Sequence, residues 1–255
     1  MIGCDCAVCR SEDPRDKRMR PSILIELDSG LTLLVDTTPD LRMQALAHRL
    51  RRLDALLFTH SHFDHIAGLD ETRRFNVLMG TPLPVFGDGP TLEDLARVFS
   101  YAFERGKPRG GGVPDLRLWT IGGPFCIAEL EIVPVPIYHG TRTILGYRFG
   151  GLAYLTDCSG IPDASLALLR DLDTLVLDAL RRRPHPTHFN LDQAVAMASR
   201  IGARQTLFTH IAHELGHADT CAALPAGMAL AYDGLGLEIP HSPFPSPHSP
   251  VTINE

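Results

Sequence analysis

The order of apolar and polar residues along the chain predicts alternating short strands and helices. Apolar runs at 22–27 and 31–36 flank the turn 28–30 and are typical of a β-hairpin. Residues 39–52 place leucines and alanines on one stripe and arginines on the opposite side, which predicts an amphipathic helix. The apolar run 53–59 then predicts a buried strand that ends directly before His60.

The rest of the chain repeats this alternation. Further strands are expected at 84–86, 116–121, 125–137, 144–149, 152–156, 174–177 and 205–208, and a last strand at 229–232 or 236–239. Helices are expected at 91–104, with Thr91 as N-cap, and at 163–170 and 191–201. Residues 107–112 read as a flexible glycine-rich loop, and 181–188 as the loop before the last helix. We expect one α/β domain over 1–239, followed by a proline-rich disordered tail over 240–255.

Composition excludes several classes of protein. The 255-residue chain is 44% hydrophobic and 21% charged, which is ordinary for a globular protein. Its net charge of −6 gives no global attraction for nucleic acid. No apolar run approaches the roughly 20 residues of a membrane helix, and Met1–Cys4 does not begin a signal peptide. We therefore expect a cytoplasmic protein without a membrane or nucleic-acid partner.

Histidines gather where strands end, and this is the first indication of function. The stretch 60–65 reads His-Ser-His-Phe-Asp-His directly after the buried strand 53–59. Three imidazoles and a carboxylate within six residues are costly to bury together unless a divalent metal satisfies them. Alternate residues His60 and His62 can converge on one cation, while Asp64 and His65 point to a second.

The motif H-x-H-x-D-H after a hydrophobic strand resembles the metallo-β-lactamase superfamily. The resemblance implies a four-layered αββα sandwich with a dinuclear site of Zn²⁺ or Mn²⁺. Residues that match the later metal ligands of the superfamily occur in the expected order, each at the end of an expected strand. The implied ligands are His60, His62 and His139 on one metal, Asp64, His65 and His210 on the other, and Asp157 bridging both. Redox members of the superfamily carry Glu at the position of His62, so His62 favours hydrolysis.

Three cysteines near the start of the chain indicate which branch of the superfamily it resembles. Cys4, Cys6 and Cys9 cannot complete a tetrahedral zinc site without a fourth ligand. The arrangement resembles the PhnP-like branch, the phosphoribosyl cyclic phosphodiesterases, in which a structural zinc takes three such cysteines and a later histidine. That histidine corresponds to His213. Relatives carry an edge strand before the cysteines, so either the start of this chain is misassigned or the first sheet lacks that strand.

The same resemblance suggests residues that act on substrate. His188 matches a histidine that contacts the scissile phosphate and protonates the leaving oxygen, although it could be a helix N-terminal residue without a catalytic role. Arg73 could hold a substrate anion or form a structural ion pair. His185 and His217 have no clear counterpart, and we expect both to face solvent.

The resemblance therefore implies a dinuclear-metal phosphodiesterase acting on a small or cyclic phosphodiester through a metal-bridging hydroxide, with Asp64 and Asp157 orienting the nucleophile. Thioester or lactone hydrolysis uses the same metals and stays open, as does a nuclease akin to tRNA 3′-processing enzymes. A homodimer is the assembly to test first.

The string 213–217 (HELGH) matches the H-E-x-x-H motif of zinc proteases. The extended protease pattern fails, because Thr220 and Ala223 stand where Gly and His are required. We interpret the string as a coincidence that overlaps His210 and His213.

Overall fold

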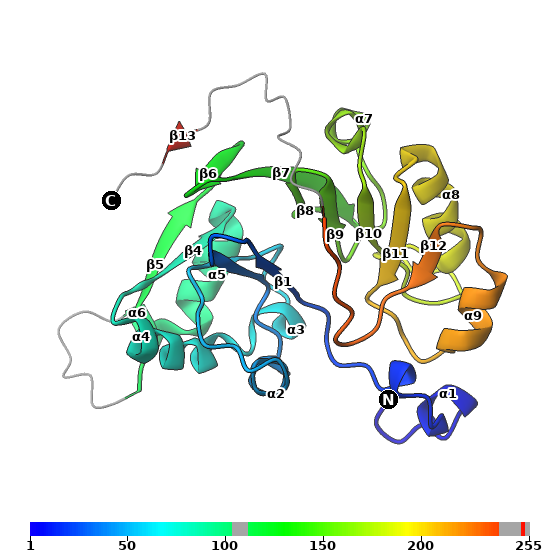
Figure 1. Cartoon of the computed structure of the whole chain (residues 1–255), viewed down its shortest axis with the longest axis horizontal. Helices are drawn as coiled ribbons and strands as arrows, with labels where there is room; N and C mark the ends of the chain where they lie inside the picture. The colour runs from blue at the N-terminus through cyan, green and yellow to red at the C-terminus, as the bar shows by residue number, and fades with distance from the viewer. Residues whose placement is uncertain (104–111, 240–250, 253–255) are drawn as a thin grey trace. The chain divides into compact units, whose positions relative to one another are not determined.

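The computed structural model describes residues 1–103, 112–239 and 251–252 (Figure 1). Its internal contacts divide the chain into two compact units. The smaller unit is Arg20–Gly122, and the larger combines Met1–Met19 with Gly123–Glu255. The single domain expected over 1–239 stays a prediction. The segment 107–111 of the expected loop and most of the expected disordered tail lie outside the described residues.

The smaller unit is built on a five-stranded sheet with the order β1-β2-β3-β4-β5 (Figure 1). β1 pairs antiparallel with β2, and the later pairs are parallel. The strands are β1 (Ile23–Glu26), β2 (Thr32–Val35), β3 (Ala55–Leu57), β4 (Leu83–Gly87) and β5 (Leu116–Thr120). All residues of β2 and β3 are buried, as expected for central strands covered on both faces.

The helical elements of this unit are short. They are α2 (Leu41–Ala47), α3 (Phe63–Ile66), η2 (Leu69–Thr72), α4 (Arg73–Met79), α5 (Gly89–Val98) and α6 (Ser100–Phe103). The expected helix 91–104 differs in two ways. Asp88 is the N-cap of α5 in place of Thr91, because its side chain accepts the backbone N–H of Thr91. The helix also breaks at Phe99, which separates α5 from α6.

The larger unit is built on an eight-stranded sheet with the order β12-β11-β10-β9-β8-β7-β6-β13 (Figure 1). Its strands are β6 (Phe125–Ile127), β7 (Leu130–His139), β8 (Arg142–Phe149), β9 (Leu152–Leu155), β10 (Thr174–Asp178), β11 (Gln205–Thr209), β12 (Met228–Leu230) and β13 (Val251–Thr252). β9 to β12 are parallel neighbours, whereas β6 to β9 are antiparallel. The carboxyl ends of β9, β10 and β11 therefore meet at one edge of the sheet.

The strand expected at 125–137 is two strands. Ala128 takes a left-handed backbone conformation with φ of 49°, and the chain reverses there so that β6 pairs antiparallel with β7. The last strand before residue 240 is β12 at 228–230, close to the first of the two expected positions. Val251–Thr252, within the expected tail, form a further strand, β13.

The remaining helices of this unit are α1 (Ala7–Arg10), η1 (Pro14–Asp16), α7 (Asp163–Leu166), η3 (Ala167–Leu169), α8 (Leu191–Ile201) and α9 (His217–Ala223). α8 matches its expected bounds because both ends carry strong signals. Asn190 and Gln193 form a capping box, and Gly202 ends the helix in a left-handed conformation. Among the described residues, no helix has the length and apolar character needed to cross a bilayer.

Candidate metal centre and active site

The motif 60–65 leaves β3 and enters the short helix α3, which keeps its histidines close together. The ring centroid of His60 lies 4.6 Å from that of His62 and 4.4 Å from that of His65. His60 and His65 are buried, at 1% and 0% exposed, although both are polar. Buried imidazole rings are stable only when their nitrogens have a hydrogen-bond partner or a bound metal.

Asp36, at the end of β2, orients both buried histidines. Nδ1 of His65 donates to Oδ2 of Asp36 at 2.8 Å. The Thr59 hydroxyl donates to the same oxygen at 2.8 Å, so it accepts at 3.0 Å from Nδ1 of His60. With Nδ1 protonated, the neutral imidazole carries its lone pair on Nε2, the form that coordinates a metal.

Asp36 itself is held in an unusual backbone conformation, with φ of 65°. Its Oδ1 accepts the backbone N–H of Thr59 at 2.9 Å, and its side chain is fully buried. Asp64 is partly exposed and pairs with Arg20 at 3.2 Å. The smaller unit thus holds two oriented imidazoles, with the His62 ring and the Asp64 carboxylate close to them.

A second group of polar residues lies at strand ends of the larger unit. His139 ends β7, Asp157 follows β9, and His210 follows β11. Asp157 and His210 take left-handed conformations, with φ of 55° and 57°. Such strain in residues other than glycine gathers at functional sites.

Asp157 is the centre of this group. Its Oδ1 lies 3.2 Å from Nε2 of His210, and its Oδ2 lies 3.8 Å from Nε2 of His188 and 4.0 Å from Nε2 of His139. One donor atom each from Asp157, His188 and His210 lies within 4.8 Å of the others. The set is thus close enough to share a cation.

His139 is fixed in the form that binds metals. Its Nδ1 donates to the backbone oxygens of Asp157 and Thr187, both at 2.8 Å, so its lone pair lies on Nε2. Burial lowers the pKa of His139, although the nearby Asp157 carboxylate opposes this shift. The ring is therefore neutral at neutral pH.

His188 pairs with a carboxylate that the sequence reasoning missed. Nδ1 of His188 donates to Oδ2 of Asp178 at 2.8 Å, and the same oxygen accepts the backbone N–H of Cys158 at 2.8 Å. Asp178 is fully buried at the end of β10, where Thr174–Asp178 runs as one buried strand. A buried acidic residue that ends an apolar strand was the signal that could have found it.

The two histidines expected in solvent are placed differently. His217 is buried, at 5% exposed, and the expectation of a solvent-facing side chain was wrong. It begins α9 and contacts Tyr232 edge-on, with ring centroids 5.5 Å apart. His185 is only partly exposed, and its ring centroid lies 4.9 Å from that of His188.

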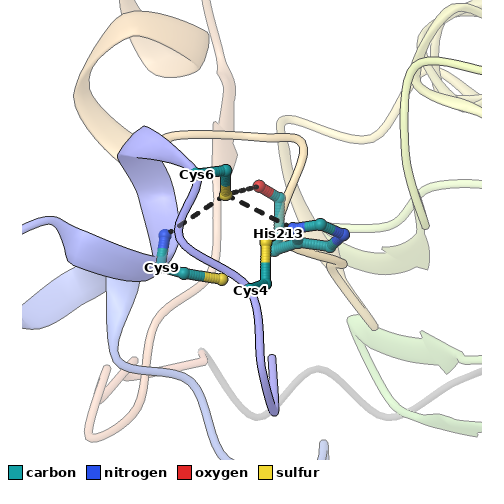
Figure 2. A group of neighbouring side chains, drawn as sticks. All are labelled: Cys4, Cys6, Cys9 and His213. Atoms are coloured by element: carbon teal, nitrogen blue, oxygen red, sulfur yellow. Dashed lines mark hydrogen bonds between the residues drawn. The ribbon is translucent and has the colours of Figure 1, made fainter.

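Cys4, Cys6 and Cys9 lie together with His213, the residue that the family resemblance implied as their partner (Figure 2). The sulfurs of Cys4 and Cys6 each lie 3.3 Å from Nδ1 of His213, which is more than 200 residues away in the chain. Cys9 completes a group whose ligand atoms all lie within 4.8 Å of one another. The backbone N–H of Cys9 and the His213 side chain lower the pKa of Cys6 to about 6. Three sulfurs and one imidazole form a donor set typical of structural zinc.

Arg73 forms the structural ion pair, the second of its two expected roles. It begins α4 and pairs with Asp70, whose backbone oxygen also accepts from its guanidinium at 3.3 Å. Its role in substrate binding stays a prediction. The assignment of ligands to two metals, which draws on residues of both units, also stays a prediction.

Comparison with known proteins places this arrangement in a family. Residues 32–211 match the model of the β-lactamase superfamily domain. The crystal structure of a new diphosphatase from the PhnP family is 45% identical, with a TM-score of 0.87 over 93% of this chain and 91% of that one. The short form of human tRNase Z has a TM-score of 0.66 over 87% of this chain and 93% of that one, and at 17% identity it shows the fold alone.

An octanoyltransferase of Porphyromonas gingivalis is 37% identical over 92% of this chain. The chain spans about half of the length of that relative, 48%. The mixed α/β fold with two sheets agrees with the metallo-β-lactamase fold expected from the sequence. The chain belongs to the β-lactamase superfamily, and within it to the PhnP-like branch.

Proposed function

We propose that this protein is a dinuclear-metal phosphodiesterase that hydrolyses a small or cyclic phosphodiester. The observation that carries the proposal is the pair formed by His188 and the buried Asp178, next to Asp157 and His210. A histidine oriented by a buried carboxylate beside a metal-binding group is suited to transfer a proton to a departing oxygen.

The donor groups of each unit suit a divalent metal, which supports the proposal of two metals. Each unit supplies imidazoles whose Nδ1 is already donating, as at His65 and His139. Carboxylates at Asp64 and Asp157 add the negative charge that two cations require. When bound, such cations activate water near neutral pH and neutralise phosphoryl oxygens. The His-rich set favours Zn²⁺, and its carboxylates also suit Mn²⁺.

The chain's own residues supply the other steps. Asp178 accepts the Nδ1–H of His188, so the proton to be delivered is the one that Nε2 holds when the ring is protonated. A protonated His188 is stabilised by Asp178 and by Asp157, 3.8 Å from Nε2. Delivery of the Nε2 proton to the leaving oxygen avoids the formation of a free alkoxide.

A diphosphate is the second candidate substrate, because the 45%-identical structure is that of a diphosphatase. The phosphorus atom of a diphosphate that carries an ester group has the same two substituted oxygens as a phosphodiester. The same residues could therefore act on both.

We further propose a structural zinc held by Cys4, Cys6, Cys9 and His213, which ties the N-terminal segment to the loop that follows β11. Arg18 supports this attachment, since its guanidinium donates to the backbone oxygens of Ala212 and Leu215. We place the protein in the cytoplasm and consider a homodimer. Nucleic acid is a poor partner for a chain with a net charge of −6.

The test is turnover by purified, metal-loaded protein. Bis-p-nitrophenyl phosphate, a ribose cyclic phosphate, a dinucleoside diphosphate, a thioester, a lactone and a tRNA precursor are compared at equal enzyme concentration. We expect turnover of the phosphate esters. Turnover confined to the thioester or the lactone would refute the phosphodiesterase proposal, as would no turnover with the metals shown to be bound.

A further inference from the structure

His185 lies beside the catalytic histidine of the proposed function but has no part in the mechanism above. Its ring centroid is 4.9 Å from that of His188, and the two rings are tilted by 59°. His188 is 8% exposed, whereas His185 is more accessible. His185 is therefore the more accessible of two histidine rings that lie side by side.

The hydrogen bonds of His185 define which of its nitrogens carries the proton in the neutral ring. The backbone N–H of Thr187 can only donate, and it reaches Nδ1 of His185 at 3.3 Å. The hydroxyl of Thr187 lies 3.2 Å from the same atom. Nδ1 is therefore an acceptor, and the proton of the neutral ring lies on Nε2. His185 thus presents an N–H donor beside the active histidine.

The loop that carries His185 is held in place at several points. Arg181 folds back onto it and donates to the backbone oxygens of Arg183 and Pro184, at 3.3 Å and 3.0 Å. Arg183 pairs with Glu214, the neighbour of the proposed zinc ligand His213. These contacts hold the backbone before His185.

The residues after His185 are held as firmly. The backbone oxygen of Thr187 accepts from Nδ1 of His139 at 2.8 Å. Gly140 lies so close that a Cβ there would be 2.8 Å from Cγ2 of Thr187. A donor held in advance loses little entropy when it binds, which is the property of a residue that selects its ligand.

We propose that His185 is a specificity-determining residue whose Nε2–H donates to an oxygen of the departing group, next to the oxygen that His188 protonates. This inference rests on the proposed function. It predicts a preference for substrates whose leaving group carries a further oxygen close to the scissile bond. The second phosphate of a diphosphate has such oxygens, and the p-nitrophenolate of bis-p-nitrophenyl phosphate does not.

The test compares His185→Phe, which keeps a ring but has no donor, with His185→Gln, whose amide can place a donor near Nε2. His48→Phe, at an exposed position outside the site, is the control. For each variant, kcat/KM is measured with diadenosine diphosphate and with bis-p-nitrophenyl phosphate. Metal content and the unfolding midpoint are measured on the same samples.

We expect His185→Phe to lower kcat/KM for diadenosine diphosphate about 5- to 10-fold, the effect of one lost hydrogen bond, with a change below about twofold for bis-p-nitrophenyl phosphate. His185→Gln should recover most of the loss. An equal loss on both substrates would mean that His185 only supports the loop, and no loss on either would mean that it does not contact substrate. Both results overturn the inference.

A binding measurement separates this inference from the proposed function. Inorganic diphosphate is titrated calorimetrically into the metal-loaded wild type, His185→Phe and His185→Gln. If the wild type cleaves neither substrate, the proposed function fails. A weaker Kd for diphosphate in His185→Phe alone would still support the contact by His185, whereas equal Kd values in all three proteins would overturn it.

Discussion

Asp178 allows the sharpest test of the proposed proton transfer, because one of its oxygens serves two partners. Oδ2 accepts from Nδ1 of His188 and from the backbone N–H of Cys158, both at 2.8 Å, and the side chain is fully buried. Asp178→Asn keeps the shape and can keep an acceptor at this point, while it removes the negative charge. The variant therefore changes the electrostatics with little change in packing.

The expected loss follows from the nature of the hydrogen bond. A bond to a charged partner contributes roughly 1.5–3 kcal/mol, against roughly 0.5–1.5 kcal/mol for a neutral one. The difference, about 1–1.5 kcal/mol, applies most strongly when His188 is protonated and about to donate. Since 1.36 kcal/mol corresponds to a tenfold change in rate, we expect kcat to fall roughly 5- to 10-fold.

Asp178→Ala would be a poor substitute for this test. It would leave the buried N–H groups of His188 and Cys158 without their acceptor, at about 1–3 kcal/mol each. Together these losses, about 2–6 kcal/mol, are a large fraction of the total stability of a domain, roughly 5–15 kcal/mol. Loss of activity in that variant could therefore reflect unfolding.

The assay measures kcat for bis-p-nitrophenyl phosphate, metal content by atomic spectroscopy and the thermal unfolding midpoint for the wild type and Asp178→Asn. The reasoning requires a lower kcat with metal content unchanged. An unchanged kcat would refute the role of Asp178 in orienting and charging His188. Loss of metal together with activity would instead show that the pair belongs to the metal-binding group.

Three further predictions follow from single contacts. Cys6→Ser should release about one zinc per chain and lower the unfolding midpoint, with the other metals retained, as metal analysis before and after refolding would show. His188→Ala should lower turnover about 10²-fold or more without loss of metal, the usual scale of general acid catalysis; full activity would exclude its role as proton donor. Gly140→Ala should destabilise the protein by about 1–2 kcal/mol from its left-handed backbone alone, measured by denaturant unfolding, and more if Thr187 cannot move; unchanged stability would show that the loop yields there.

The sequence predicted the elements whose signals are local. α8 has a capping box at one end and glycine at the other, and its bounds were predicted to the residue. β3 was predicted from a continuous apolar run. Short helices such as α3 and α9 have too few residues for a periodic pattern, and their helical form depends on tertiary contacts. The break at Phe99 lies within an apolar pattern that does not mark it.

The residues of the candidate site differ in the same way, because some belong to a local sequence motif and others do not. The motif 60–65 and the cysteine cluster are dense local patterns. His213, the distant partner of the cysteines, was predicted from the resemblance to a known family. Asp178 is one of thirty acidic residues and has no motif of its own. Its importance arises only when β9 and β10 pair in parallel and bring Asp178 to the backbone of Cys158 and to the loop that holds His188.

The histidines show why burial must be known before a role can be assigned. His185 and His217 were given the same prediction, because neither corresponds to a residue of the family pattern. In the structure, His217 is buried where α9 begins, and the other ring lies against His188 with one nitrogen accepting from Thr187. That hydrogen bond depends on the local conformation of 185–187, in which Pro186 separates the two partners, so the donor on Nε2 of His185 can be inferred only from the folded loop. Burial of the His217 ring and the hydrogen bond to Nδ1 of His185 thus separate two histidines that the sequence pattern treats alike.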